Sequence, residues 1–143
     1  MFIAKELRKK SIAEYLLYMW QIEDIIRAMG CSLPLIRKAY VSKFTDYTDE
    51  QKEEELDWFG NLVRMINEEG KREQGHLDIN TIVVKDMADL HNRLLKSDKF
   101  PIYNAEYYKA YEAIGTSNIA TASDTMTVEM IEMPTLYPIM VIM

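Results

Sequence analysis

The sequence predicts an all-α protein, a single-domain bundle of about five helices. Two observations predict this fold class. Apolar residues recur three and four positions apart along most of the chain, and capping residues or glycines stand at the ends of these runs. The chain has 143 residues, of which 48% are hydrophobic and 28% are charged, which is typical of a globular domain with its own core.

The first predicted helix spans residues 3–29 and carries the most informative pattern in the chain. Its segment 12–27 is apolar on nearly every side, which is typical of a helix at the centre of a bundle. Gly30 follows, and we expect it to end the helix in a left-handed conformation. The apolar residues that share the helical spacing are Ile3, Leu7, Leu16, Met19, Ile22, Ile26 and Met29.

This apolar helix also carries carboxylates, and a buried carboxylate must be paired or hydrogen-bonded. Burial raises the pKa of a carboxyl group, so a buried Glu14 would be a candidate acid or base. The alternative is that Glu14 simply bonds a neighbouring arginine, lysine or tyrosine. We group Glu14, Tyr18 and Glu23 as a candidate pocket beside the first helix.

Two further helices follow, each with a recognisable start. Ser32 is a candidate cap for a short helix that has Pro34 in its first turn, where the missing N–H costs nothing. Thr48 and Gln51 match a capping box, which begins a helix that Gly70 ends. We expect the acidic first half of that helix to be a solvated face, with docking of a basic partner as the alternative. Its acidic residues are Glu50, Glu53, Glu54, Glu55 and Asp57.

The last two predicted helices span residues 78–96 and 105–114. Asn104 is a candidate cap for the second of them. Tyr107 and Tyr111 share one helix face, and tyrosines are common at interfaces and pocket rims as well as in cores. The residues of helix 78–96 that we expect to face inward are Ile79, Ile82, Val83, Leu90 and Leu94.

The regular helical spacing of apolar residues ends after Gly115. We therefore divide it into a helical bundle, residues 1–115, and a loop with an irregular apolar tail, residues 116–143. Apolar side chains such as Leu136, Tyr137 and Ile139 are unfavourable in water. We expect this tail to pack on the bundle or on a second subunit.

Composition excludes several function classes. The net charge of −6 argues against nucleic-acid binding, and no apolar run is long enough to span a membrane. The single cysteine, Cys31, forms no internal disulfide and suits a reducing compartment. Glu73 and His76 form half of a helical metal-binding motif, but Gly75 interrupts it. We expect no metal and no other cofactor.

Three motifs carry a family resemblance: Ile-Ala-Glu-Tyr-Leu-Leu-Tyr-Met-Trp-Gln-Ile-Glu-Asp at residues 12–24, Gly-His-Leu at 75–77 and Lys-Phe-Pro-Ile-Tyr at 99–103. Within a match over residues 3–114, they resemble an uncharacterised family of short bacterial proteins known only as a domain of unknown function. The resemblance implies a mainly helical, bacterial, cytoplasmic protein. It supplies no activity, cofactor or site residue.

The sequence identifies no activity, and whether the protein is an enzyme stays open. We expect a non-enzymatic cytoplasmic interaction protein that self-associates as a homodimer, with Tyr107, Tyr111 and the apolar tail in its interface. An unidentified protein partner or small ligand is a further expectation. The alternative is a small-molecule or metal-dependent helical enzyme or ligand-binding protein. Its site would lie beside the first helix, at Glu14, Tyr18 and Glu23 with one of the two histidines, His76 or His91.

Overall fold

The computed structural model describes residues 1–118, with side chains through residue 113. That range is all-helical and has no strand, which confirms the predicted all-α class, although it holds six α-helices rather than about five. The chain divides into two compact parts, residues 1–81 and residues 82 onward. The elements are α1 (Phe2–Lys10), α2 (Ile12–Ala28), α3 (Leu33–Ala39), the 3-10 turn η1 (Val41–Lys43), α4 (Asp49–Glu68), α5 (Asp78–Leu95) and α6 (Pro101–Asn118).

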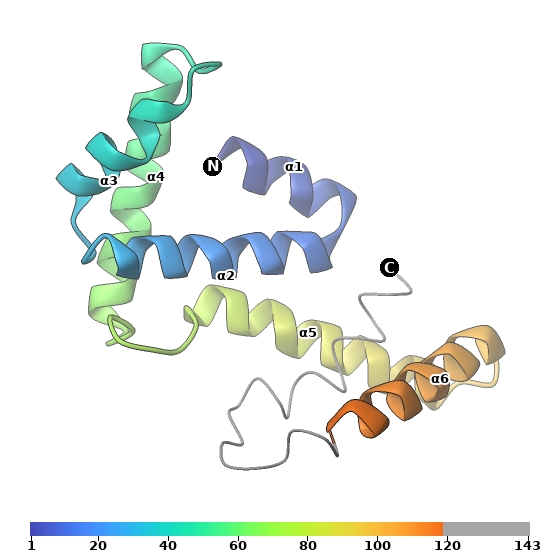
Figure 1. Cartoon of the computed structure of the whole chain (residues 1–143). Helices are drawn as coiled ribbons and strands as arrows, with labels where there is room; N and C mark the ends of the chain where they lie inside the picture. The colour runs from blue at the N-terminus through green and yellow to red at the C-terminus, as the bar shows by residue number, and fades with distance from the viewer. Residues whose placement is uncertain (119–143) are drawn as a thin grey trace. The chain divides into compact units, whose positions relative to one another are not determined.

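The first predicted helix is two helices in the structure, because the helical backbone is interrupted at Ser11. This residue has extended backbone, with φ −155° and ψ 115°, and its side chain accepts a hydrogen bond from the Glu14 N–H at 3.3 Å. A serine in this conformation caps the helix that follows it. The continuous helix expected over residues 3–29 is therefore wrong, and α1 folds back along α2 (Figure 1).

The other predicted helix ends in residues 1–81 are confirmed. Gly30 and Gly70 follow α2 and α4 with φ of 62° and 67°, a region that glycine adopts without strain. The Ser32 side chain accepts from the Leu35 N–H at the start of α3. At Thr48 both bonds of the capping box are present, with lengths of 2.9 and 3.2 Å.

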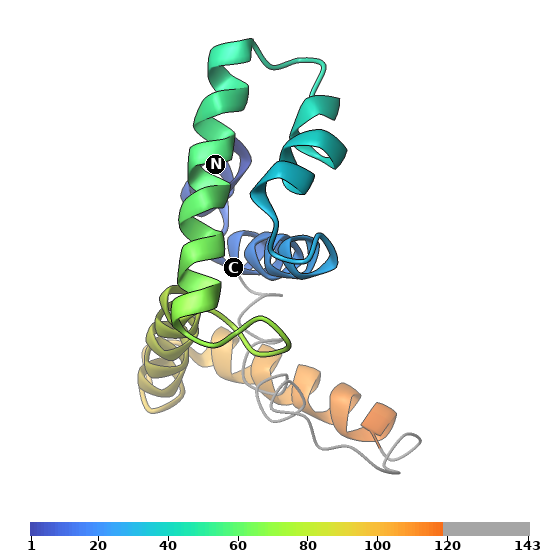
Figure 2. The same ribbon diagram turned by 90° about the vertical axis from the view of Figure 1, so that its left-hand side faces the viewer.

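Residues 1–81 enclose a core between four helices, α1 to α4. α2 packs against α1 and α4, and α3 lies alongside α4 (Figures 1 and 2). Edge-to-face aromatic pairs such as Tyr40–Phe59 and Phe2–Tyr47 line the same part. The fully buried apolar residues are Met19, Ile22, Ile26, Ile36, Val41, Phe59, Leu62, Ile66 and Leu77.

The predicted inner face of α5 is wrong at three of its five residues, whereas the other two, Val83 and Leu94, are half-buried. Ile79, Ile82 and Leu90 are exposed, and the buried residues are Asn80, Val84, Met87 and His91. The buried set has helical spacing too, since its members lie four, three and four positions apart. The exposed apolar residues suggested a different inner face. The buried stripe was hard to recognise because two of its members, Asn80 and His91, are polar.

The boundaries of α6 also differ from the prediction. The helix begins at Pro101 and continues through Gly115 to Asn118. Proline suits a first helical position, because the N–H that it lacks would have no helical partner there and its φ is already helical. Asn104 therefore lies inside the helix, where its side-chain nitrogen donates to the carbonyl of Phe100 at 3.1 Å. It is not the helix cap.

Candidate functional site

Glu23 is buried in residues 1–81, with 1% of its surface exposed. It occupies the inner stripe of α2, three positions before Ile26 and four after Met19, and both of these neighbours are buried. A buried carboxylate without partners is strongly unfavourable. The groups that it contacts therefore determine what Glu23 does.

Both oxygens of Glu23 accept hydrogen bonds or contact donors near the start of α5. Oε1 accepts from the backbone N–H of Leu77 at 3.0 Å and from the side-chain nitrogen of Asn80 at 2.7 Å. Oε2 lies 2.8 Å from Nδ1 of His76. Because the N-terminal end of a helix is partially positive, a carboxylate is well placed there. Glu23 thus acts as a cap supplied from a distant segment of the chain.

His76 joins this carboxylate to an aromatic surface. Its ring stacks on Trp20, with centroids 4.8 Å apart and an interplanar angle of 28°. Trp20 precedes Glu23 by three positions in α2, so both contact His76 from the same side of that helix. The stack and the ion-pair geometry together fix the orientation of the imidazole.

Two arginines form hydrogen bonds that hold in place the loop preceding His76. Arg27 donates from Nε to the carbonyl of Lys71 at 3.0 Å and from a terminal nitrogen to the carbonyl of Gly75. Arg72 reaches back to the carbonyl of Gly30 at 3.2 Å. The planar guanidinium presents several donors in a fixed geometry, which suits it to clamping backbone carbonyls.

Two buried polar atoms near Glu23 have no hydrogen-bond partner within the part of the chain that the structure describes. They are Nε1 of Trp20, a donor, and Oδ1 of Asn80, an acceptor. Buried polar groups are nearly always satisfied by protein or by ordered water. These two atoms therefore mark where an internal water or a small polar molecule would find partners.

The three residues grouped from the sequence do not converge on one pocket. Glu14 is exposed on the first turn of α2. It precedes Glu23 by nine positions, which in an α-helix is about two and a half turns and places the two side chains on opposite faces. Tyr18 is half-buried, and its pKa is raised by burial and by the nearby Tyr40 and Glu55.

Glu55 is a functional position that the sequence analysis missed. It was expected on a solvated acidic face, but only 3% of its surface is exposed. Its carboxylate binds the ammonium of Met1 at 2.6 Å and the N–H of Phe2 at 3.1 Å, so it caps α1. The available signal was spacing, because Glu55 lies on the same helical stripe as Phe59 and Leu62.

Residues 82–118 hold the second histidine in an aromatic setting. His91 is buried, and its Nδ1 lies 2.7 Å from the hydroxyl of Tyr103. Its ring also packs 4.7 Å from that of Tyr107, which contacts Tyr108 and Tyr111 in turn. Burial lowers the pKa of His91.

The predicted interface residues are partly placed by the structure. Tyr107 is half-buried against His91, whereas Tyr111 is 52% exposed. Leu136, Tyr137 and Ile139 lie outside the described residues. The tyrosine face of α6 therefore has one anchored ring and one ring open to solvent.

The chain matches the family model described as a domain of unknown function, DUF4924, over residues 1–143. It belongs to the DUF4924 family. The match confirms the family resemblance and extends it from residues 3–114 to the apolar tail. No curated protein and no solved structure gives a significant match to the chain.

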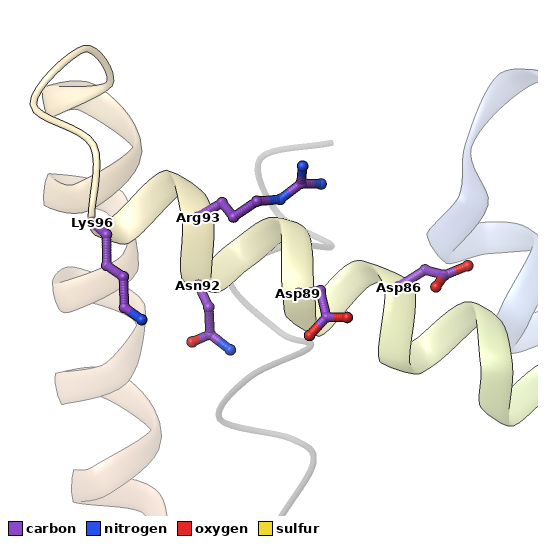
Figure 3. Close-up of a pocket in the computed structure, with 5 residues that line it drawn as sticks. All are labelled: Asp86, Asp89, Asn92, Arg93 and Lys96. Atoms are coloured by element: carbon purple, nitrogen blue, oxygen red, sulfur yellow. The ribbon is translucent and has the colours of Figure 1, made fainter.

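Other features of this DUF4924 chain concern its surface. Over the described residues, no helix is long and apolar enough to cross a membrane, and no three metal-ligating side chains form a cluster. The surface of α5 carries a polar hollow, and the side chains that line it project outward from the helix (Figure 3). They are Asp86, Asp89, Asn92, Arg93 and Lys96.

Proposed function

We propose that this DUF4924 protein is a non-enzymatic helical interaction protein that self-associates as a homodimer through residues 82–118. One observation carries the proposal, namely the apolar surface that this part exposes. Ile102 is 78% exposed, and Ile82, Tyr108 and Tyr111 are each more than half exposed. Large exposed apolar patches are typical of interaction sites, and tyrosine is enriched at such sites.

The tail completes this proposal. Leu136, Tyr137 and Ile139 need an apolar surface, and the exposed tyrosines of α6 offer one. We assign Tyr107 and Tyr111 to contacts with this segment, in the same chain or in the second subunit. As part of the same proposal, the protein is bacterial and cytoplasmic, and its helices form a single bundle with α2 at the centre. The free thiol of Cys31 supports a reducing compartment.

The test is the oligomeric state of the full chain, measured by sedimentation velocity and native mass spectrometry across the micromolar range. We expect a dimer that dissociates on dilution. A variant with Ile82, Ile102, Tyr108 and Tyr111 replaced by serine should be monomeric, because it loses the exposed apolar surface of residues 82–118. The matched control replaces Ile3, Leu17 and Leu35, the exposed apolar residues of helices α1 to α3, and should remain dimeric.

A wild-type chain that stays monomeric throughout would overturn the proposal. A control variant that dissociates while the first variant does not would move the interface to residues 1–81.

A second candidate function is the binding of a small polar ligand beside α2. The observation that favours it is the unpartnered pair of polar atoms on Trp20 and Asn80, next to the paired Glu23 and His76. The same mass spectra test this candidate. An added mass that disappears on denaturation, and is absent from a Trp20→Phe variant, would support it.

A further inference from the structure

The solvent-facing side of α5 has a regular seam. We define the outer seam of α5 as Ile82, Asp86, Asp89 and Arg93 of that helix together with Lys96, the residue that follows it and whose N–H donates to the carbonyl of Asn92 at 3.2 Å. These residues lie four, three, four and three positions apart, the spacing at which one helix presents a continuous stripe to another. All five are exposed, and four of them line the polar hollow of α5 (Figure 3).

Charge along the outer seam is ordered. Its two carboxylates come first and its two cations come last, so the N-terminal half is negative and the C-terminal half is positive. Within the described part of the chain, neither Asp86 nor Asp89 forms an ion pair with Arg93, Lys96 or any other cation. The charges of the seam therefore remain available to another molecule.

The charged positions are symmetric about one residue. Asp86 and Lys96 each lie five positions from His91, and Asp89 and Arg93 each lie two positions from it. His91 itself is buried, so the helix surface directly opposite it points outward. A two-fold axis through that surface would bring every seam carboxylate of one helix opposite a seam cation of an antiparallel copy. Since the helix rises 1.5 Å per residue, the paired charges would lie at the same height.

We propose that two copies of this chain pack their α5 helices antiparallel along the outer seam. Asp86 faces Lys96 of the second copy and Asp89 faces its Arg93, with both contacts repeated by symmetry. The proposal rests on the self-association proposed above and adds to it a contact between the two α5 helices. The occupant is a second copy because the seam is complementary to itself, which is the requirement for a closed two-fold interface. A parallel arrangement would place like charges together, which disfavours it.

The charges provide direction and specificity, and apolar contact adds to the affinity. Exposed ion pairs contribute little individually. Ile82, 55% exposed, lies at the N-terminal end of the seam, nine positions before His91. The α5 helix of the antiparallel copy ends at Leu95, four positions after His91, so residues of the second copy that follow its α5 would have to cover Ile82, and its burial there would be favourable. The seam therefore combines one apolar position with four charges that select the antiparallel orientation.

The experiment uses two charge-reversal variants of the full chain. The first, Asp86→Lys with Asp89→Lys, makes the seam entirely positive, and the second, Arg93→Glu with Lys96→Glu, makes it entirely negative. Sedimentation velocity then gives the dimer dissociation constant of each variant alone and of an equal mixture of the two. The matched controls change the net charge equally on exposed residues of the other part: Glu50→Lys with Glu54→Lys, and Lys38→Glu with Lys43→Glu.

We expect each seam variant alone to self-associate at least about 10-fold more weakly than the wild type, because like charges face one another four times. The mixture should form a heterodimer at least as tight as the wild-type dimer, and both controls should behave as the wild type. Recovery on mixing also shows that each variant chain is folded.

Two other outcomes have different meanings. A monomeric wild type contradicts the proposed self-association and with it the seam contact. A wild-type dimer that both seam variants retain, with no preference for the heterodimer, overturns the seam contact alone and leaves self-association through another surface.

Discussion

The two parts of the described chain differ in how they satisfy their apolar residues. Residues 1–81 bury many of theirs between several helices, including Phe59, Ile66 and Leu77. Residues 82–118 bury only a few, such as Val84, Met87 and Tyr103, and leave Ile102 78% exposed. Two helices offer each other one face each, so a helix pair leaves much of its surface in water. Among the described residues, the second part therefore leaves a larger share of its apolar side chains exposed than the first.

The buried polar groups of the two parts also differ, in how far apart in the sequence their hydrogen-bond partners lie. In residues 1–81, Glu23 and Glu55 each bind the start of a helix far away in the sequence, and so join segments that local interactions do not connect. In residues 82–118, His91 bonds Tyr103, only twelve positions away. Long-range polar bonds add specificity to an already packed core, whereas the buried polar bond described in the second part, between His91 and Tyr103, is short-range.

The largest expected effect tests the difference in packing. Phe59→Ala should lower the free energy of unfolding by about 3–5 kcal/mol, because it removes a fully buried ring. Ile102→Ala should change the same quantity by less than about 0.5 kcal/mol, since its side chain is exposed. Urea unfolding at a protein concentration where the chain is monomeric measures both. Equal costs for the two substitutions would contradict the comparison.

The next effect tests the long-range cap. Glu23→Ala should cost about 3 kcal/mol, because the Leu77 N–H and the Asn80 amide lose their buried acceptor. Glu23→Gln keeps one acceptor oxygen and should cost roughly 1 kcal/mol. Urea unfolding followed by circular dichroism provides the values.

The neighbouring Asp24 is the matched control for this prediction. Its side chain is 80% exposed and pairs with Arg27 at 3.1 Å, and surface pairs contribute little. Asp24→Asn should leave the unfolding free energy within about 0.5 kcal/mol of the wild type. If Asp24→Asn proved as costly as Glu23→Ala, the effect would come from net charge rather than from the cap.

Local patterns predicted local structure well. The all-helical fold, the capping box at Thr48, the cap at Ser32 and the left-handed glycines at positions 30 and 70 all depend on interactions within a few residues. The same logic identifies the break at Ser11. Ser11 and Glu14 have the spacing of a capping box, but the apolar periodicity on both sides was read as one helix.

Buried polar residues account for the main errors. Glu55 in α4, and Asn80 and His91 in α5, each lie on a helical stripe whose other members are apolar and buried. Reading polarity alone assigns such residues to the surface, whereas reading spacing assigns them to the core. Polarity also led to the choice of Ile82 and Leu90 as inner residues of α5, and this choice was wrong.

The contact between Glu23 and His76 lies beyond what periodicity reveals. Both residues were singled out, but 53 positions separate them. Their meeting depends on how the loop after α4 is held by Arg27 and Arg72, through bonds to backbone carbonyls. Carbonyls occur at every position, so such bonds leave no pattern of residue types.

The smallest effect concerns the polar bond of the second part. Tyr103→Phe should cost about 1 kcal/mol at neutral pH, because it removes the hydroxyl next to buried His91. We also expect acid to lower the free energy of unfolding of residues 82–118. Burial lowers the pKa of His91, whereas in the unfolded chain histidine titrates near about 6.5.

As the pH falls below that value, the unfolded chain binds a proton that the folded chain does not. The free energy of unfolding therefore falls as the pH is lowered through this window toward the folded pKa of His91, and it is restored above the window. Hydrogen exchange of α5 and α6, corrected for intrinsic rates, should show faster opening at the lower pH. His91→Gln carries no titrating ring and should flatten this dependence. An unchanged pH dependence in His91→Gln would assign the acid sensitivity to other titratable groups.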